Sequence, residues 1–183
     1  MTARPLLDER LHALGAGTFP HVNGTLERHL QGTERLLRQW GNREAVCVAG
    51  LYHAVYGTDG IEGCLTGLDT REAVARVIGV EAESLVYLYG ACDRERFHPR
   101  IGTPAQNAFV DRFASREYPI GDAELRDFCE ITVANELDLA LGNPGFARRH
   151  AASLLELFAR MRGLASAAAQ RAAFDVLSRA TER

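Results

Sequence analysis

The chain of 183 residues contains no lysine, so all 21 of its strongly basic residues are arginine. We attribute this absence to coding bias in a GC-rich genome and draw no function from it. Aspartate and glutamate total 24, which gives a net charge of −3, and there is no basic tail or lysine-rich block. These features argue against nucleic acid as a partner.

Cysteine is sparse, and its four positions never form a CxxC pair: Cys47, Cys64, Cys92 and Cys129. This spacing argues against a zinc knuckle, and four cysteines are too few for a disulfide framework in a chain of this length. Cys47 and Cys129 lie in apolar helical stretches, so we predict that they are buried free thiols.

Long apolar runs are also missing, because no segment reaches the roughly 18 apolar residues that a membrane span needs. Residues 1–5 lead into the chain without an apolar h-region, so we expect no signal peptide and a cytoplasmic protein. Hydrophobic residues make up 46% and charged residues 25%, as in globular proteins. We predict one domain over residues 1–183, with a core at about 22–141 and a C-terminal helical pair at about 144–182.

Apolar residues recur at helical spacing along nearly the whole chain, which predicts an all-α fold without strands. Loops are expected at 57–67 and 93–103. The expected helices cover residues 6–14, 24–40, 43–54, the stretch between Asp69 and Gly79, 81–92, Pro104 to about Arg116, 123–141, 145–162 and about 164–181.

Three helix starts carry capping signals. Asp69 is followed three residues later by Glu72, which is the spacing of a capping box. Asp122 precedes the long apolar helix, and Asn143 is followed by proline at the first helical position.

His29 and His53 are the first candidate site residues. They lie on consecutive predicted helices joined by the short turn Gly41-Asn42, so the two imidazoles can converge on one point. Neutral imidazole is a common ligand of transition metals. The alternative is that both are histidines at the edge of the core, bonded to backbone carbonyls.

A polar, glycine-rich loop follows the helix that carries His53. We expect Tyr56, Asp59 and Glu62 to line the mouth of a site there, with the two carboxylates as candidate general bases or metal ligands. The alternative is a solvated loop with an Asp-Gly turn.

Asn135 and Asp138 share a face of the otherwise apolar helix 123–141, because they are three residues apart. Leaving such a pair buried and unpartnered costs about 1–3 kcal/mol per group, so we expect both to be hydrogen-bonded or to bind a metal. The alternative is that they tie this helix to a neighbour.

Taken together, these segments resemble the HD-domain superfamily, most closely the hydrolase domain of the stringent-response alarmone enzymes. His29 matches the family's first histidine, and residues 51–59 (LYHAVYGTD) match its LLHDTVEDT segment. Residues 78–86 and Ala134-Asn135 match two later segments in the same order. The chain also resembles an uncharacterised group of small bacterial proteins with HLxGTxxLLxxWG and AGLYHxxYGT strings. The resemblance implies a single HD-type helical bundle.

The departures from the family concern its metal ligands. In the family, two histidines and two aspartates hold one divalent metal, often manganese; here Ala54 and Asn135 stand at the aspartate positions, and Gly57-Thr58 stands at the catalytic Glu-Asp pair. Losing two carboxylates weakens the hold on a hard cation, which argues against alarmone hydrolysis by the usual route. The resemblance leaves His29, His53 and Asn135 as possible ligands of iron or manganese.

Several further residues have open roles. His21 and His98 lie near positions where diiron oxygenases of the HD type place extra histidines, although those enzymes keep the aspartate that is absent here; the alternative is that both are surface or loop histidines. Arg94 and Arg96 form a solvated charge cluster or meet an anionic substrate.

We therefore expect a small-molecule enzyme, either a metal-dependent hydrolase or oxygenase or a metal-free lyase or isomerase. Its candidate catalytic residues are Tyr56, Asp59 and Glu62 with His53 and Asp138. The rival hypothesis is a non-catalytic module that binds a nucleotide or metabolite in a degenerate pocket. The alanine-rich last helix is a candidate surface for a homodimer.

Overall fold

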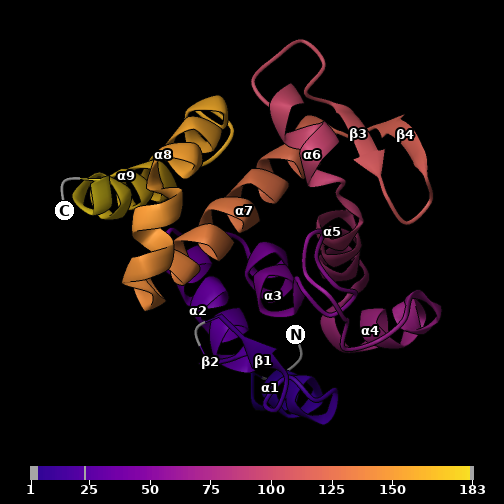
Figure 1. The fold of residues 1–183 in the computed structure, drawn as a ribbon. Helices are drawn as coiled ribbons and strands as arrows, with labels where there is room; N and C mark the ends of the chain where they lie inside the picture. Colours follow the sequence, from indigo (N-terminus) through magenta and orange to yellow (C-terminus); the bar gives the residue numbers. More distant parts are fainter. Residues whose placement is uncertain (1–3, 23, 182–183) are drawn as a thin grey trace.

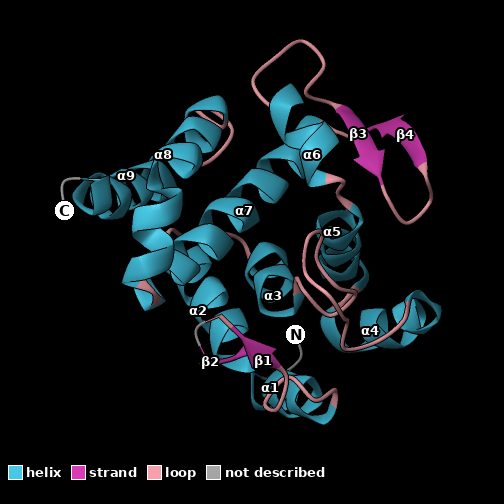
Figure 2. Ribbon diagram, viewed as in Figure 1, coloured by secondary structure: helices cyan, strands magenta, loops and turns pink. Residues whose placement is uncertain are grey.

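The computed structural model describes residues 4–22 and 24–181, and in this part the chain is mostly helical (Figures 1 and 2). The mostly helical class is confirmed, but two small two-stranded sheets are also present, so the prediction of no strands is wrong. None of the described helices is long and apolar enough to cross a membrane.

Most of the expected helices are present with small shifts at their ends, and the exceptions are described below. The first half contains α1 (Arg4–Ala13), β1 (Pro20–His21), β2 (Gly24–Thr25), α2 (Leu26–Gln39), α3 (Glu44–Tyr52), a 3₁₀ turn (Leu68–Thr70), α4 (Arg71–Ile78) and α5 (Val80–Ala91). The second half contains α6 (Arg94–Phe97), a 3₁₀ turn (His98–Arg100), β3 (Ala108–Asp111), β4 (Arg116–Pro119), α7 (Asp122–Gly142), α8 (Pro144–Arg160) and α9 (Ala167–Thr181).

Helix α7 is the central element, and α2, α3, α5, α8 and α9 all contact it. In Figure 1 it crosses the middle of the molecule, with α8 and α9 together at one end and the β3–β4 hairpin at the other. Helices α2 and α3 pack on each other and on α7. This arrangement brings side chains from α2, α3 and α7 to one place.

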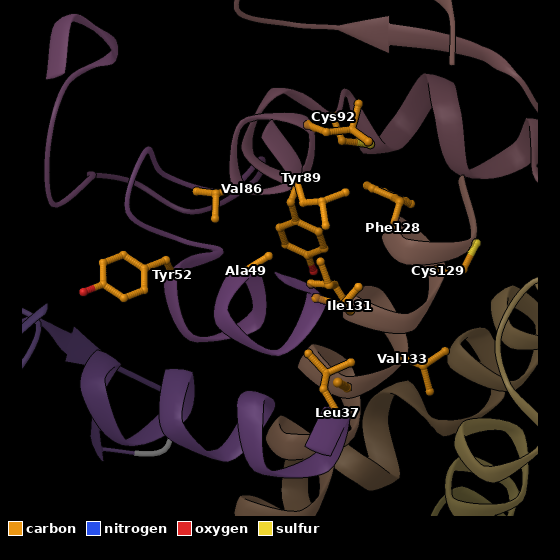
Figure 3. Packing of buried hydrophobic residues seen from close by; sticks show 14 of the residues in the cluster. Leu37, Ala49, Tyr52, Val86, Tyr89, Cys92, Phe128, Cys129, Ile131 and Val133 are labelled. Carbon is orange, nitrogen blue, oxygen red and sulfur yellow. The ribbon is translucent and has the colours of Figure 1, made fainter. Parts of the chain in front are cut away.

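The core lies where α3, α5 and α7 meet. Figure 3 shows Tyr89 of α5 between Ala49 of α3 and Phe128 and Ile131 of α7. The Tyr89 and Phe128 rings are 5.6 Å apart, and such aromatic pairs add about 0.5–1.5 kcal/mol beyond the burial of their area. Figure 3 also shows Cys129 in this core, and Cys47 and Cys129 are both buried free thiols, as predicted.

The segment from Pro104 to Arg116 is not helical, which corrects the prediction. Residues 108–111 pair with residues 116–119 as an antiparallel hairpin, with Phe109 opposite Tyr118. The turn contains Ser115 with a φ of 51°, a left-handed conformation that a helix excludes. Phe109 and Phe113 are four residues apart, which imitates the spacing of a helix and explains the wrong prediction.

Three local expectations are also corrected. The segment after Cys92, expected to be a loop, contains α6, whose N-cap side chain Asp93 accepts the N–H of Arg96 at 3.0 Å. Asp69 lies inside the 3₁₀ turn, and α4 begins without a side-chain cap. Helix α7 is capped by Gly121, whose N–H donates to Glu124 at 2.8 Å, rather than by Asp122.

The start of α8 is as predicted. The Asn143 side chain accepts the N–H of Phe146 at 3.0 Å, and Pro144 occupies the first helical position. The predicted C-terminal helical pair is therefore present as α8 and α9, which pack on each other.

Candidate functional site

A cavity of about 310 Å³ opens where the β1–β2 hairpin, α2, α3, α7 and the loop after α3 come together. This size is at the low end for small-molecule sites. Its polar lining includes three histidines and three charged side chains, and its outer part is apolar. The lining residues that matter below are Phe19, His21, Val22, Leu26, His29, His53, Ala54, Asp59, Ile61, Arg94, Asn135, Glu136, Leu139 and Phe146.

His29 lies in the wall of this cavity and is held at both ring nitrogens. Its Nδ1 is 2.7 Å from Asp138 Oδ2, and its Nε2 is 2.9 Å from Asn135 Oδ1. Asn135 and Asp138 are thus hydrogen-bonded, and they also tie α7 to α2, as the alternative interpretation expects. Because the Asn135 amide nitrogen donates to Glu136 Oε1 at 2.9 Å, its oxygen is the atom that faces His29.

This arrangement has a consequence for the protons on His29. An oxygen acceptor faces each ring nitrogen, and a ring can donate to both only if each nitrogen carries a hydrogen. A ring that donates to both oxygens is an imidazolium paired with the Asp138 carboxylate, and His29 is only 2% exposed. A hydrogen bond between charged groups of this kind is stronger than a neutral one.

Gly32 makes the His29–Asp138 contact possible. Helices α2 and α7 approach so closely here that a Cβ atom at position 32 would lie 1.8 Å from Asp138 Oδ1. Any larger residue would push the carboxylate away from His29. Gly50 has the same role between α2 and α3, because a Cβ there would lie 2.3 Å from Leu37 Cδ1.

His53 ends α3 and is held in one tautomer. Its Nδ1 donates to the carbonyl of Gly50 at 2.7 Å, so Nε2 carries the lone pair. Burial, followed by the charge of nearby His29, lowers the pKa of His53 to about 3. His53 is therefore a neutral hydrogen-bond acceptor, and its ring centre is 5.2 Å from that of His29.

His21 completes a row of three imidazoles. It stacks on His29 with ring centres 4.4 Å apart and planes inclined by 17°. Burial, followed by the charge of His29, lowers the pKa of His21 to about 4. Its Nδ1 is buried and has no hydrogen-bond partner among the residues that the structure describes.

Arg94 and two carboxylates form the charged part of the cavity. The backbone N–H of Arg94 donates to Asp59 Oδ2 at 2.9 Å, and its guanidinium donates to the Tyr89 hydroxyl at 3.0 Å. The same guanidinium lies 3.5 Å from Glu136 Oε1. Arg94 and Asp59, both predicted candidates, are thus brought together, while Glu136 was missed.

Tyr56 and Glu62, by contrast, do not line the cavity. The Tyr56 hydroxyl donates to Glu83 at 3.0 Å, and Glu83 also pairs with Arg71 at 2.6 Å. Burial, followed by the charge of Glu83, holds the pKa of Tyr56 above its usual value. Glu62 is exposed on the loop. The structure therefore corrects the expectation that these two side chains line the mouth.

The remaining candidates lie outside the cavity. Arg96 donates a hydrogen bond to Glu117 at 2.6 Å on the surface. This fits the alternative interpretation, a solvated charge cluster. His98 borders a second, open cavity of about 430 Å³ beyond Arg94 and Glu136. Burial lowers the pKa of His98 to about 4, and its Nε2 has no hydrogen-bond partner in the described ranges 4–22 and 24–181.

The side chains that could bind a metal ion determine which ions the site fits. Across residues 4–22 and 24–181, no group of three or more histidine, cysteine, aspartate or glutamate side chains is placed to hold a metal ion. The expected ligands His29, His53 and Asn135 comprise two imidazoles and an amide, and the neighbouring lining residue Ala54 offers no donor atom in its side chain. Hard cations such as Mg²⁺ need carboxylates, so this set does not fit them.

Comparison with known proteins gives one match. Residues 10–94 match the model of a family described as a domain of unknown function, DUF6817. The match runs from α1 to the first residue of α6 and includes His21, His29 and His53 but not Asn135. No curated protein and no solved structure matches the chain.

Proposed function

We propose that this protein is an HD-type helical bundle that acts as a small-molecule enzyme through the imidazoles of His29 and His53, without a bound metal. The observation that carries the proposal is the position of His29 between Asp138 and Asn135, with an oxygen at each nitrogen. In this arrangement a proton occupies the place between His29 and residue 135 where the HD family has its cation.

The arrangement is suited to general acid catalysis. His29 Nε2–H can leave the neutral amide of Asn135 and donate to a substrate atom that gains negative charge as a bond breaks. Asp138 remains bonded to Nδ1 and keeps the ring oriented, as a carboxylate does for a catalytic histidine. Such a step belongs to a lyase, isomerase or hydrolase.

His53 has a different role in this proposal. Because its pKa is lowered to about 3, it stays neutral at physiological pH and is a weak base. Its Nε2 lone pair instead accepts a hydrogen bond from an O–H or N–H of the substrate. That bond fixes the substrate beside the acidic His29, and such positioning is itself a large part of catalysis.

A metal-dependent hydrolase or oxygenase is the second candidate, and one observation favours it. His29 and His53 each direct Nδ1 at an oxygen acceptor, which is how metal-binding histidines are usually oriented. Two imidazoles and an amide would hold a borderline ion such as iron(II) better than manganese(II). The ion would supply Lewis-acid or oxygen chemistry, and Asn135 would complete the ligand set.

Metal content separates the two candidates. Protein purified without chelators or a histidine tag is analysed by elemental mass spectrometry, together with the double variant Ala54→Asp, Asn135→Asp. The proposal predicts far less than one equivalent of any transition metal in the natural chain, and a clear gain when the two carboxylates are restored. One equivalent of iron in the natural chain, lost in His53→Ala, would support the second candidate instead.

Catalysis itself is tested by metabolite profiling. The protein is incubated with a bacterial metabolite extract, and depleted and newly formed compounds are followed by mass spectrometry. We expect at least one substrate–product pair that disappears in His29→Gln and persists in the surface control Asp69→Asn. Identical profiles for the natural chain and His29→Gln would contradict an enzymatic role for His29.

A further inference from the structure

The charges around the cavity do not balance. His29 is paired with Asp138, which leaves Arg94 as the one other cation among the described lining residues, facing the carboxylates of Asp59 and Glu136. The guanidinium of Arg94 lies 3.5 Å from Glu136. Asp59 receives the backbone N–H of Arg94, and no side-chain cation pairs with it among the described residues. One negative charge at the cavity therefore lacks its own partner.

The polar wall also offers mainly acceptors. His53 presents the Nε2 lone pair, because its Nδ1 donates to Gly50. Asp59 presents a carboxylate, and His21 Nδ1, which accepts or donates according to its tautomer, is buried and without a partner in the described part of the chain. A buried polar atom without a partner calls for an explanation, such as a ligand that supplies the missing bond. A ligand rich in N–H donors would satisfy these atoms.

The outer part of the cavity is apolar. Phe19, Leu26 and Phe146 line it, and Val22 and Ile61 stand at its rim with 56% and 48% of their surface exposed. Exposed apolar side chains gathered around a cavity are typical of a binding site. An attached alkyl or aryl group would cover them.

From these three observations we infer that the cavity binds an amphipathic organic amine, with its ammonium group at Asp59 and its apolar part between Phe19 and Phe146. The inference deepens the proposed function by naming its substrate class and rests on that proposal. Carboxylates and phosphate esters are disfavoured, because they would meet Asp59 and Glu136 while the cation Arg94 is already engaged.

The test compares three probes of equal length on the full chain: hexylamine, hexanol and hexanoate, each titrated by calorimetry at neutral pH. A charge-assisted hydrogen bond is stronger than a neutral one, so we expect hexylamine to bind at least about tenfold more tightly than hexanoate. Tighter binding of hexanoate, or no difference between the two, would overturn the inference. Absence of binding by all three probes would overturn it as well.

Two variants locate the probe. Asp59→Asn keeps an acceptor for the Arg94 N–H but removes the charge, so hexylamine affinity should fall about tenfold while hexanol affinity is unchanged. Asp69→Asn, exposed in the 3₁₀ turn, is the matched control and should change neither. Ile61→Ser should weaken hexylamine and hexanol alike. Unchanged hexylamine binding in a folded Asp59→Asn would contradict the assignment of the ammonium site.

These results are independent of the test of His29. If hexanoate is preferred while His29→Gln still abolishes turnover, the amine inference fails and the acid–base proposal stands. If the probes bind as expected while His29→Gln leaves the metabolite profile unchanged, the proposed catalysis fails and the cavity remains a binding site for amines.

Discussion

Two buried polar networks in this molecule differ in how completely they are satisfied. The first joins Glu83 to Arg71 and Tyr56, and in the described structure it lies outside the cavity of the three histidines. The second joins His29 to Asp138 and Asn135 and ends at the cavity, where His21 Nδ1 has no partner in the described ranges. A closed network stabilises a fold, whereas an open one leaves atoms for a ligand.

Acidification should have the largest effect on stability, and it acts through three histidines outside the closed network. Burial lowers the pKa values of His53 to about 3 and of His21 and His98 to about 4, against 6.5 in the unfolded chain. Below pH 6.5 the unfolded state therefore binds more protons, so stability is full above that pH and falls as pH decreases toward 4. Each of these histidines lowers the free energy of unfolding by up to about 1.4 kcal/mol for each pH unit below 6.5.

Urea unfolding at pH 7.0 and pH 5.0 measures this effect. We expect a loss of several kcal/mol in the natural chain, and a smaller loss in His21→Asn, because one of the three titrating groups is gone. Equal stability at the two pH values would contradict the neutral, buried state of these histidines.

Removal of Glu83 tests the closed network. Its side chain is 6% exposed, and Glu83→Ala leaves the Tyr56 hydroxyl and Arg71 without their partner. Breaking a fully buried pair costs about 3–5 kcal/mol. The 37% exposure of Arg71 reduces the expected loss to about 3 kcal/mol in denaturant unfolding.

Glu72→Ala is the matched control, because the Glu72 side chain is 94% exposed beside Arg76. It should cost less than about 0.5 kcal/mol. Glu83→Ala should also leave hexylamine binding unchanged, and a loss of that binding would show that the two networks are coupled.

A methyl group at position 32 tests the open network. Gly32→Ala places a Cβ on the Asp138 carboxylate and separates it from His29. Overpacking of this kind costs about 1–3 kcal/mol, and we expect about 2 kcal/mol in urea unfolding. Glu72→Ala, at a side chain that is 94% exposed, is again the control. Equal stability of the two variants would contradict the close contact of α2 and α7.

Removal of the Asp138 charge should have the smallest effect on stability. Asp138→Asn keeps a polar group beside His29 Nδ1 but loses the ion pair, so we expect a cost of about 1 kcal/mol in urea unfolding. The same variant should abolish the turnover that depends on His29. Full turnover in Asp138→Asn would contradict the role of the carboxylate in orienting the ring.

The part of the site that lies on helices could be predicted from the sequence. Helical spacing predicted that Asn135 and Asp138 share a face, because periodicity determines which face of a helix a side chain occupies. That His29 belongs with Asn135 was implied by the family resemblance alone. His21 was left open, since its position depends on the β1–β2 pairing of two residues each, which is too short to give a strand pattern.

Loop residues were harder to place for a related reason. Tyr56 and Asp59 are three residues apart, yet one points to Glu83 and the other lines the cavity. No periodicity governs such a turn, and its path depends on tertiary contacts such as the Arg94 N–H that holds Asp59. Glu136 was missed because its neighbour Asn135 was the residue matched to the HD family, and its pairing with Arg94 joins distant parts of the chain.

The protonation of His29 is the most direct test of the whole account. Nitrogen-15 labelling of histidine, with two-bond nitrogen–hydrogen correlation spectra at neutral pH, reports the hydrogens on each ring nitrogen. We predict that His29, assigned by its loss in His29→Gln, carries a hydrogen on both nitrogens, while His53 is neutral with its hydrogen on Nδ1. A neutral His29 with an unprotonated Nε2 would contradict the account.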